Sequence, residues 1–221
     1  MSLRRLIFGA VFGLGLAARA SAAEPPPVSP QFQKFILLQE NRQAVVQSLQ
    51  AQWTQFVGVA CANVKPVDWQ VEVLDPVDFR GDGKPLKGSW KETVTSEGCG
   101  FRKVFTVVSA INTDGTVKHI DMLPGTSHAD PFLERDAIGQ ARAAAASILP
   151  KECQQVLISD TAFVAQEGEP AAATLPGRDP HPWREEWTLK GCNATAIVTL
   201  HFVPDAKGTG IHAAVNESRP G

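Results

Sequence analysis

The chain has 221 residues and a formal net charge of −2, with 43% hydrophobic, 20% charged and 7% aromatic residues. This balance is typical of a globular protein and excludes collagen, a coiled coil and wholesale disorder. The sequence contains no tyrosine, which excludes any mechanism that needs a phenol as acid, base or hydrogen-bond donor.

Residues 1–22 have the pattern of a secretory signal peptide. Two arginines precede an apolar run, and Ala20-Ser21-Ala22 forms a small-residue cleavage site. The run is shorter than the about 20 residues that a membrane-spanning helix needs, and a Pro-rich lead follows at 23–28. We therefore expect cleavage near Ala22, a periplasmic or secreted protein, and no transmembrane segment in the mature chain.

The mature chain is expected to be mildly acidic. Removal of Arg4, Arg5 and Arg19 changes the formal net charge from −2 to −5. Nucleic acids and anionic membrane surfaces need a basic face on their partner, so we expect neither. The sequence favours an unidentified protein or small-molecule partner in the periplasm, and we expect no cofactor.

The first predicted α+β unit covers residues 29–126. Ser29 caps a helix that starts at Pro30, and apolar residues at three- and four-residue steps continue it to Phe56. Alternating segments between Gly, Pro and Asp clusters then predict four strands. These strands cover 69–73, 90–95, 101–111 and 117–123.

The second predicted α+β unit covers residues 127–221 and has the same order. Asp130 caps a helix that starts at Pro131 and ends before Pro150. Four alternating segments follow at 156–164, 183–189, 194–203 and 210–215. We expect each unit to lay its helix on one face of an antiparallel sheet.

An offset of 93 residues aligns the two units. Residues 90–119 match residues 183–212 without a gap and with nine identities, where about one or two would arise by chance. The identities include Trp90/Trp183, Glu92/Glu185, Gly98/Gly191, Cys99/Cys192 and His119/His212. The sequence therefore predicts a tandem duplication.

The four cysteines are expected to pair, because an exported chain with an even number of cysteines forms disulfides. Spacing alone allows three connectivities. If each copy once folded alone, its cysteines close within it, which predicts Cys61–Cys99 and Cys153–Cys192. A zinc site is disfavoured, since no Cys-x-x-Cys occurs.

Glu92 and Glu185 share a strand face with the core-facing Trp90 and Trp183. A carboxylate there is costly unless it is paired. The helices offer Arg42 and Arg135 at equivalent places, which predicts structural ion pairs Arg42–Glu92 and Arg135–Glu185. The alternative is a catalytic or ligand-binding carboxyl group, with Glu92, Glu185 and His119 as candidates.

A histidine pair is the candidate metal site. A symmetric hairpin centred between Ala206 and Lys207 places His201 opposite His212, close enough to share an ion. The same symmetry places His119 opposite Val108 in the first unit. Two ligands do not make a site without a third, so we expect no metal.

Ser127, His128 and Asp130 have the residue types of a catalytic triad. Members of such a triad meet by folding and not by adjacency in sequence, and no Gly-x-Ser-x-Gly surrounds Ser127. Helix capping explains Asp130 more simply. The leading interpretation is an exported, non-enzymatic binding or protein-interaction module. The alternatives are a hydrolase-like enzyme with a Glu/His site between the repeats, or a His-pair metal-binding protein.

Overall fold

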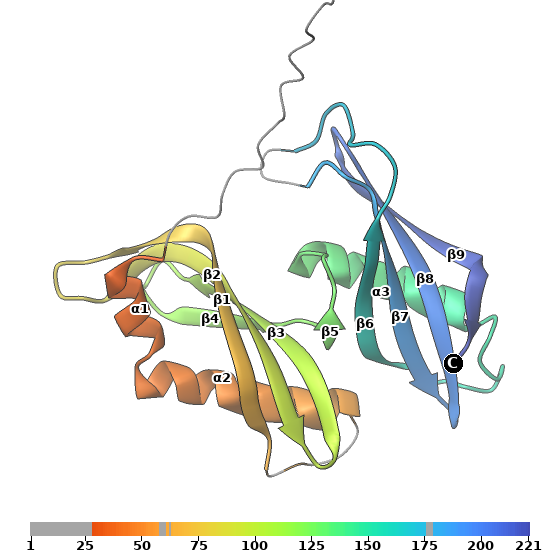
Figure 1. Ribbon diagram of the computed structural model, residues 1–221, viewed down its shortest axis with the longest axis horizontal. Helices are drawn as coiled ribbons and strands as arrows, with labels where there is room; N and C mark the ends of the chain where they lie inside the picture. The colour runs from red at the N-terminus through yellow and green to blue at the C-terminus, as the bar shows by residue number, and fades with distance from the viewer. Residues whose placement is uncertain (1–27, 58–60, 62, 176–178) are drawn as a thin grey trace, which may run out of the picture.

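The computed structural model describes residues 28–57, 61, 63–175 and 179–221. They form an α+β protein with two sheets and three α-helices, and Figure 1 shows the two halves side by side. The predicted signal peptide and residues 23–27 of the Pro-rich lead lie outside the described residues. No helix in the described part of the chain is long and apolar enough to span a bilayer.

The first half carries its helices before its strands. Its elements are α1 (Pro30–Ile36), α2 (Gln39–Gln52), the π-helical turn η1 (Trp53–Val57), β1 (Lys65–Phe79), β2 (Pro85–Gly98), β3 (Phe101–Ile111) and β4 (Val117–Asp121). The four strands form one antiparallel sheet in the order β1-β2-β3-β4. Its strand regions agree with the alternation in the sequence, although β1 extends well beyond the predicted 69–73.

The predicted first helix is broken at Leu37 and Leu38. Ser29 caps α1 as predicted, accepting the N–H of Phe32 at 3.1 Å, but α1 ends at Ile36 and α2 starts at Gln39. The break lets α1 lay Phe32 against Trp90, with ring centroids 5.2 Å apart. Between Leu38 and Val45 the only apolar residue is Ala44, so the three- and four-residue apolar spacing lapses directly after this break.

The second half has a similar order. Its elements are β5 (Gly125–Thr126), α3 (Pro131–Ala145), β6 (Leu157–Gln166), β7 (Trp183–Gly191), β8 (Ala194–Asp205) and β9 (Gly208–Pro220). Asp130 caps α3 as predicted, accepting the N–H groups of Phe132 and Leu133. The sheet has the order β5-β6-β7-β8-β9, and α3 packs on it (Figure 1).

Strand β5 is an addition that the sequence does not predict. It pairs parallel with β6, through Gly125 opposite Thr161. A Cβ atom at Gly125 would lie 1.9 Å from the carbonyl oxygen of Thr161, and its φ is 117°. Only glycine permits this approach. A strand of two residues carries too little alternation to be recognised in a sequence.

Each half has its own apolar core on the helix side of its sheet. In the first half, Val45, Leu49 and Trp53 pack on Val94 and Phe105. The second core contains the α3 alanines with Trp187, Leu189, Val198, Leu200 and Phe202. Leu123, in the segment between β4 and β5, packs against both cores. The two halves are therefore joined by apolar contact.

The disulfides connect Cys61 to Cys99 and Cys153 to Cys192, one in each half. The glycine before the second cysteine of each pair is required by the disulfide itself. A Cβ atom on Gly98 would lie 2.9 Å from Cys61 Sγ, and one on Gly191 would lie 2.6 Å from Cys153 Sγ. This contact explains why the Gly-Cys pair occurs in both halves.

Candidate functional site

Glu92 lies at the centre of a clamp formed by two tryptophans. Its side chain is buried, and its Oε1 accepts the indole N–H of Trp90 at 2.8 Å. Its Oε2 accepts the indole N–H of Trp69, also at 2.8 Å. Trp90 shares its strand and face, whereas Trp69 reaches it from β1. Both oxygens are therefore satisfied inside the first half.

Glu185 has the same arrangement with one further donor. Trp183 donates to Oε1 at 2.9 Å and Trp187 donates to Oε2 at 2.8 Å. The backbone N–H of His128 also donates to Oε1, at 2.8 Å. Glu185 has no exposed surface, and hydrogen bonds to a carboxyl group are among the stronger ones in proteins. The second clamp thereby fixes the loop that precedes α3.

The structure replaces the predicted ion pairs with these clamps. The guanidinium of Arg42 lies over the ring of Trp69, 4.8 Å from its centroid, on the indole that holds Glu92. Arg135 is exposed and pairs with its neighbour Asp136 at 3.0 Å. An indole N–H satisfies a carboxyl oxygen without burying a second charge, which avoids the desolvation cost of a buried pair.

The signal for the clamps was present in the sequence as Trp-x-Glu in β2 and Trp-x-Glu-x-Trp in β7. Alternate residues of a strand share a face, so these indoles lie beside the carboxyl group. A core-facing tryptophan in a strand pattern predicts apolar packing, but its indole N–H also needs an acceptor when it is buried. The contribution of Trp69 depends on strand register and could not be read from β2 alone.

The prediction that His119 lies opposite Val108 is wrong by one residue. His119 faces Ser109, and its Nδ1 is 2.9 Å from Ser109 Oγ. The shift of one residue arises at the turn: Ile111 pairs with Val117 across a five-residue connection, whereas Asp205 pairs with Gly208 across two residues. Glu92 and His119 are thus both engaged within the first half.

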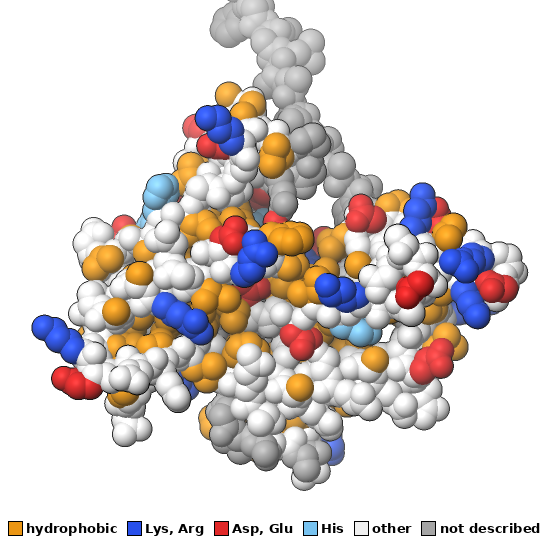
Figure 2. Space-filling model, turned by 180° about the vertical axis from the view of Figure 1, so that it is seen from behind, with side chains coloured by type: hydrophobic (Ala, Val, Ile, Leu, Met, Phe, Trp, Pro, Cys, Tyr) orange, Lys and Arg blue, Asp and Glu red, His pale blue; other side chains and the backbone are white. Residues whose placement is uncertain are grey.

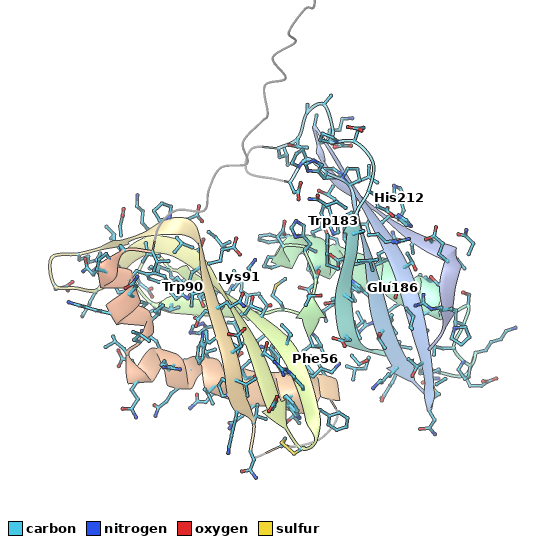
Figure 3. All side chains as sticks on the ribbon, viewed as in Figure 1. Phe56, Trp90, Lys91, Trp183, Glu186 and His212 are labelled. Atoms are coloured by element: carbon cyan, nitrogen blue, oxygen red, sulfur yellow. A yellow bond between two sulfur atoms is a disulfide. The ribbon has the colours of Figure 1, made fainter. Side chains whose placement is uncertain are left out.

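His201 lies opposite His212, as the hairpin symmetry predicts. The side chain of His201 is held by two carboxylates, with Nδ1 2.7 Å from Glu167 and Nε2 3.3 Å from Glu217. His212 is exposed on the neighbouring strand (Figure 3). The described residues contain no group of three or more His, Cys, Asp or Glu side chains arranged to hold a metal ion.

The Ser127, His128 and Asp130 side chains have separate contacts. Ser127 Oγ accepts the N–H of Ala129, and Asp130 caps α3. The ring of His128 lies 3.2 Å from Asp179 and contacts the ring of Trp183 edge-on. These contacts fix the loop against the second sheet, β5-β6-β7-β8-β9.

A cavity of about 370 Å³, which we call the linker hollow, lies between the two halves. One wall is the face of the first sheet that turns away from its helices, with Lys91, Thr93, Thr106 and Val108. The other wall is the segment 122–131, which leads into α3. Figure 3 shows Lys91 on the side of the first half that faces the second. Mixed apolar and hydroxyl walls of this kind suit a small organic ligand.

A second cavity, of about 450 Å³, lies on another side of the same segment, and we call it the Glu134 cavity. Phe56, Leu123, Ile138 and Leu157 give it apolar walls. Glu134 lines it while being only 3% exposed. Burial raises the pKa of Glu134 to about 7, which the nearby Glu185 supports and the N–H of Leu123 opposes.

Figure 2, from the reverse side, shows apolar side chains gathered across the middle of the molecule with Lys and Arg side chains among them. An ion pair also joins the halves: Lys103 Nζ of β3 lies 2.7 Å from Asp160 Oδ2 of β6. The junction therefore combines two cavities, apolar contact and an ion pair. The burial of Glu134 and the two cavities are not predicted from the sequence, because they form only where the halves meet.

Comparison with known proteins provides no relative. No protein-family model matches the chain, and neither a curated protein nor a solved structure matches it. The function is therefore argued from the geometry of the junction.

Proposed function

We propose that this protein is an exported, non-enzymatic binding module made of two disulfide-stapled α+β halves, and that its ligand occupies the linker hollow. The observation that carries the proposal is that both halves line this hollow. A ligand held there contacts two separately built units, whereas most of the carboxyl and imidazole candidates for catalysis are already engaged by neighbours within one half.

The sealed clamps favour binding over hydrolysis. A general acid or base must reach the substrate's reacting group directly or through one water. Glu92 is 4% exposed and Glu185 is fully buried, and each accepts hydrogen bonds from two indoles. These groups act as fixed parts of the fold, which leaves the linker hollow as a site for recognition.

The hollow suits a compact, largely apolar ligand. Leu74, Val108, Met122 and Leu123 supply apolar surface, and Thr93 and Thr106 supply hydroxyl groups. The nearby Lys91 already pairs with Glu72 at 2.5 Å. A neutral apolar body with one polar group therefore matches these walls better than a highly charged ligand.

Export and duplication belong to the same proposal. The pattern of residues 1–22 and the two disulfides support passage into an oxidising compartment. Tandem duplication is supported by the matching helix-then-sheet order, by the Gly-Cys turns, and by the two indole clamps. In this account, duplication created the junction in which the ligand site lies.

A fluorescent probe tests the proposed site. N-phenyl-1-naphthylamine, a neutral apolar dye, should bind to the whole mature protein, and Thr106→Trp should weaken it at least tenfold by filling the hollow. Thr188→Trp is the control, because Thr188 lies on the corresponding face of the second sheet. Equal binding by both variants, or binding by neither variant nor the parent protein, would reject the linker hollow as the site.

A further inference from the structure

The Glu134 cavity contains a buried carboxyl group that its neighbours satisfy only in part. The N–H of Leu123 donates to Oε1 at 2.5 Å. Within the described residues, no hydrogen bond reaches Oε2. A carboxyl group can accept several hydrogen bonds, and Glu134 lines the cavity. Oε2 is therefore the oxygen that can accept a hydrogen bond from a donor inside the cavity.

The walls around this oxygen are apolar and come from both halves. Phe56 enters from η1, Leu123 from the connecting segment, Ile138 from α3, and Leu157 and Ile158 from β6. Figure 3 shows Phe56 on the edge of the first half that faces the second. Surroundings of this kind strengthen an electrostatic contact made inside the cavity.

The charges around the cavity favour a cation beside Glu134. Its other charged lining groups are Asp121, Arg135 and Arg142. Arg135 is turned to Asp136, and both α3 arginines are exposed. Glu185 adds a second buried carboxyl group whose charge is felt at Glu134. An anionic ligand would therefore be repelled by Glu134 in the cavity wall and by the more distant charge of Glu185.

We propose that the Glu134 cavity binds an apolar organic amine, with its ammonium group on Glu134 Oε2 and its hydrocarbon body against the apolar walls. An ammonium group donates up to three hydrogen bonds and compensates the buried charge. This cavity and the linker hollow share Met122, Leu123 and Pro131, but Thr106 lines the linker hollow and Glu134 lines this cavity. The variants Thr106→Trp and Glu134→Gln therefore test the two proposals separately.

Three six-carbon probes test which head group the cavity prefers. Hexylamine is cationic, 1-hexanol is neutral and hexanoate is anionic, and each is titrated calorimetrically at pH 8. Hexylamine should bind at least tenfold more tightly than 1-hexanol, and hexanoate should bind most weakly. Glu134→Gln should remove the preference for the amine while keeping an oxygen for Leu123. Glu169→Gln, at an exposed loop position, is the matched control and should leave all three affinities unchanged.

Proton linkage supplies an independent readout. The ammonium group needs the ionised carboxylate, so the affinity for hexylamine should fall about a hundredfold from pH 8 to pH 5, while that for 1-hexanol stays constant. Ile138→Trp, which fills the cavity and leaves Glu134 in place, should abolish binding of both probes. Tighter binding of hexanol or hexanoate, or an amine preference that survives Glu134→Gln, would overturn the proposal.

Discussion

The backbone N–H of His128 donates to Oε1 of Glu185, which ties the loop before α3 to the middle of the second sheet. The same loop forms one wall of the linker hollow. A buried carboxyl group in the core of one half thereby fixes the shape of the junction between both halves. We therefore expect the stability of the second half and the integrity of the proposed binding site to be coupled.

Glu185→Gln should destabilise the protein by about 2–4 kcal/mol, because the new amide NH₂ would face an indole N–H or the His128 N–H. Urea denaturation measures the change in the free energy of unfolding. Glu186→Gln is the matched control: it alters the neighbouring residue on the other face, where an exposed pair with Arg219 contributes little. Equal losses in the two variants would contradict the clamp.

Glu92→Gln should be less costly than Glu185→Gln. Glu92 accepts two hydrogen bonds from indoles, whereas Glu185 accepts two from indoles and one from the backbone. The difference between the variants should be on the order of 1 kcal/mol, the net value of one hydrogen bond. A larger loss at Glu92, measured in the same urea series, would show that the third donor adds no stability.

Removal of the first disulfide by the double substitution Cys61→Ser and Cys99→Ser should cost about 4 kcal/mol, from the loop-closure entropy of the unfolded chain. The second disulfide should cost a similar amount, because the sequence separations are 38 and 39 residues. Thermal unfolding under non-reducing conditions measures both variants. A loss below about 1 kcal/mol in either half would contradict a stapling role for that disulfide.

The raised pKa of Glu134 makes stability depend on pH. The folded protein holds the proton up to about pH 7, whereas the unfolded chain releases it near pH 4.5. The free energy of unfolding therefore falls by about 3 kcal/mol as the pH rises through this range. Relative to Glu134→Gln, the parent protein should lose this amount between pH 4.5 and pH 8. A constant difference between them across the range would contradict the buried, perturbed carboxyl group.

The ion pair between Lys103 and Asp160 should couple the halves weakly. Both side chains are partly exposed, so a double-mutant cycle with Lys103→Met and Asp160→Asn should give at most about 1 kcal/mol. A coupling above about 3 kcal/mol would mean that this pair, and not the apolar contact at Leu123, dominates the junction.

The local elements could be predicted because they depend on short patterns. The Asp130 cap, the β3 boundaries at Phe101 and Ile111, and the register that opposes His201 and His212 all follow from spacing and turn symmetry. The disulfide connectivity followed from the offset that aligns the two units. In each case the determining residues lie close together in the chain or repeat at a fixed interval.

The candidate site could not be predicted in the same way. Charge complementarity favours Arg42 and Arg135 as partners of the two glutamates, but the indole N–H groups of the neighbouring tryptophans take that place. Trp69 reaches Glu92 through strand pairing, and His128 reaches Glu185 across 57 residues. Glu134 resembles an ordinary first-turn glutamate in sequence. In the fold it meets the segment between β4 and β5, where the N–H of Leu123 donates to its carboxyl group.

Hydrogen–deuterium exchange of the protein with and without saturating N-phenyl-1-naphthylamine tests whether a ligand binds between the halves. We expect new protection in β3 around residues 104–108 and in the segment 122–131, the two walls of the linker hollow. Protection confined to β8 and β9, or no protection at all, would contradict a binding site between the halves.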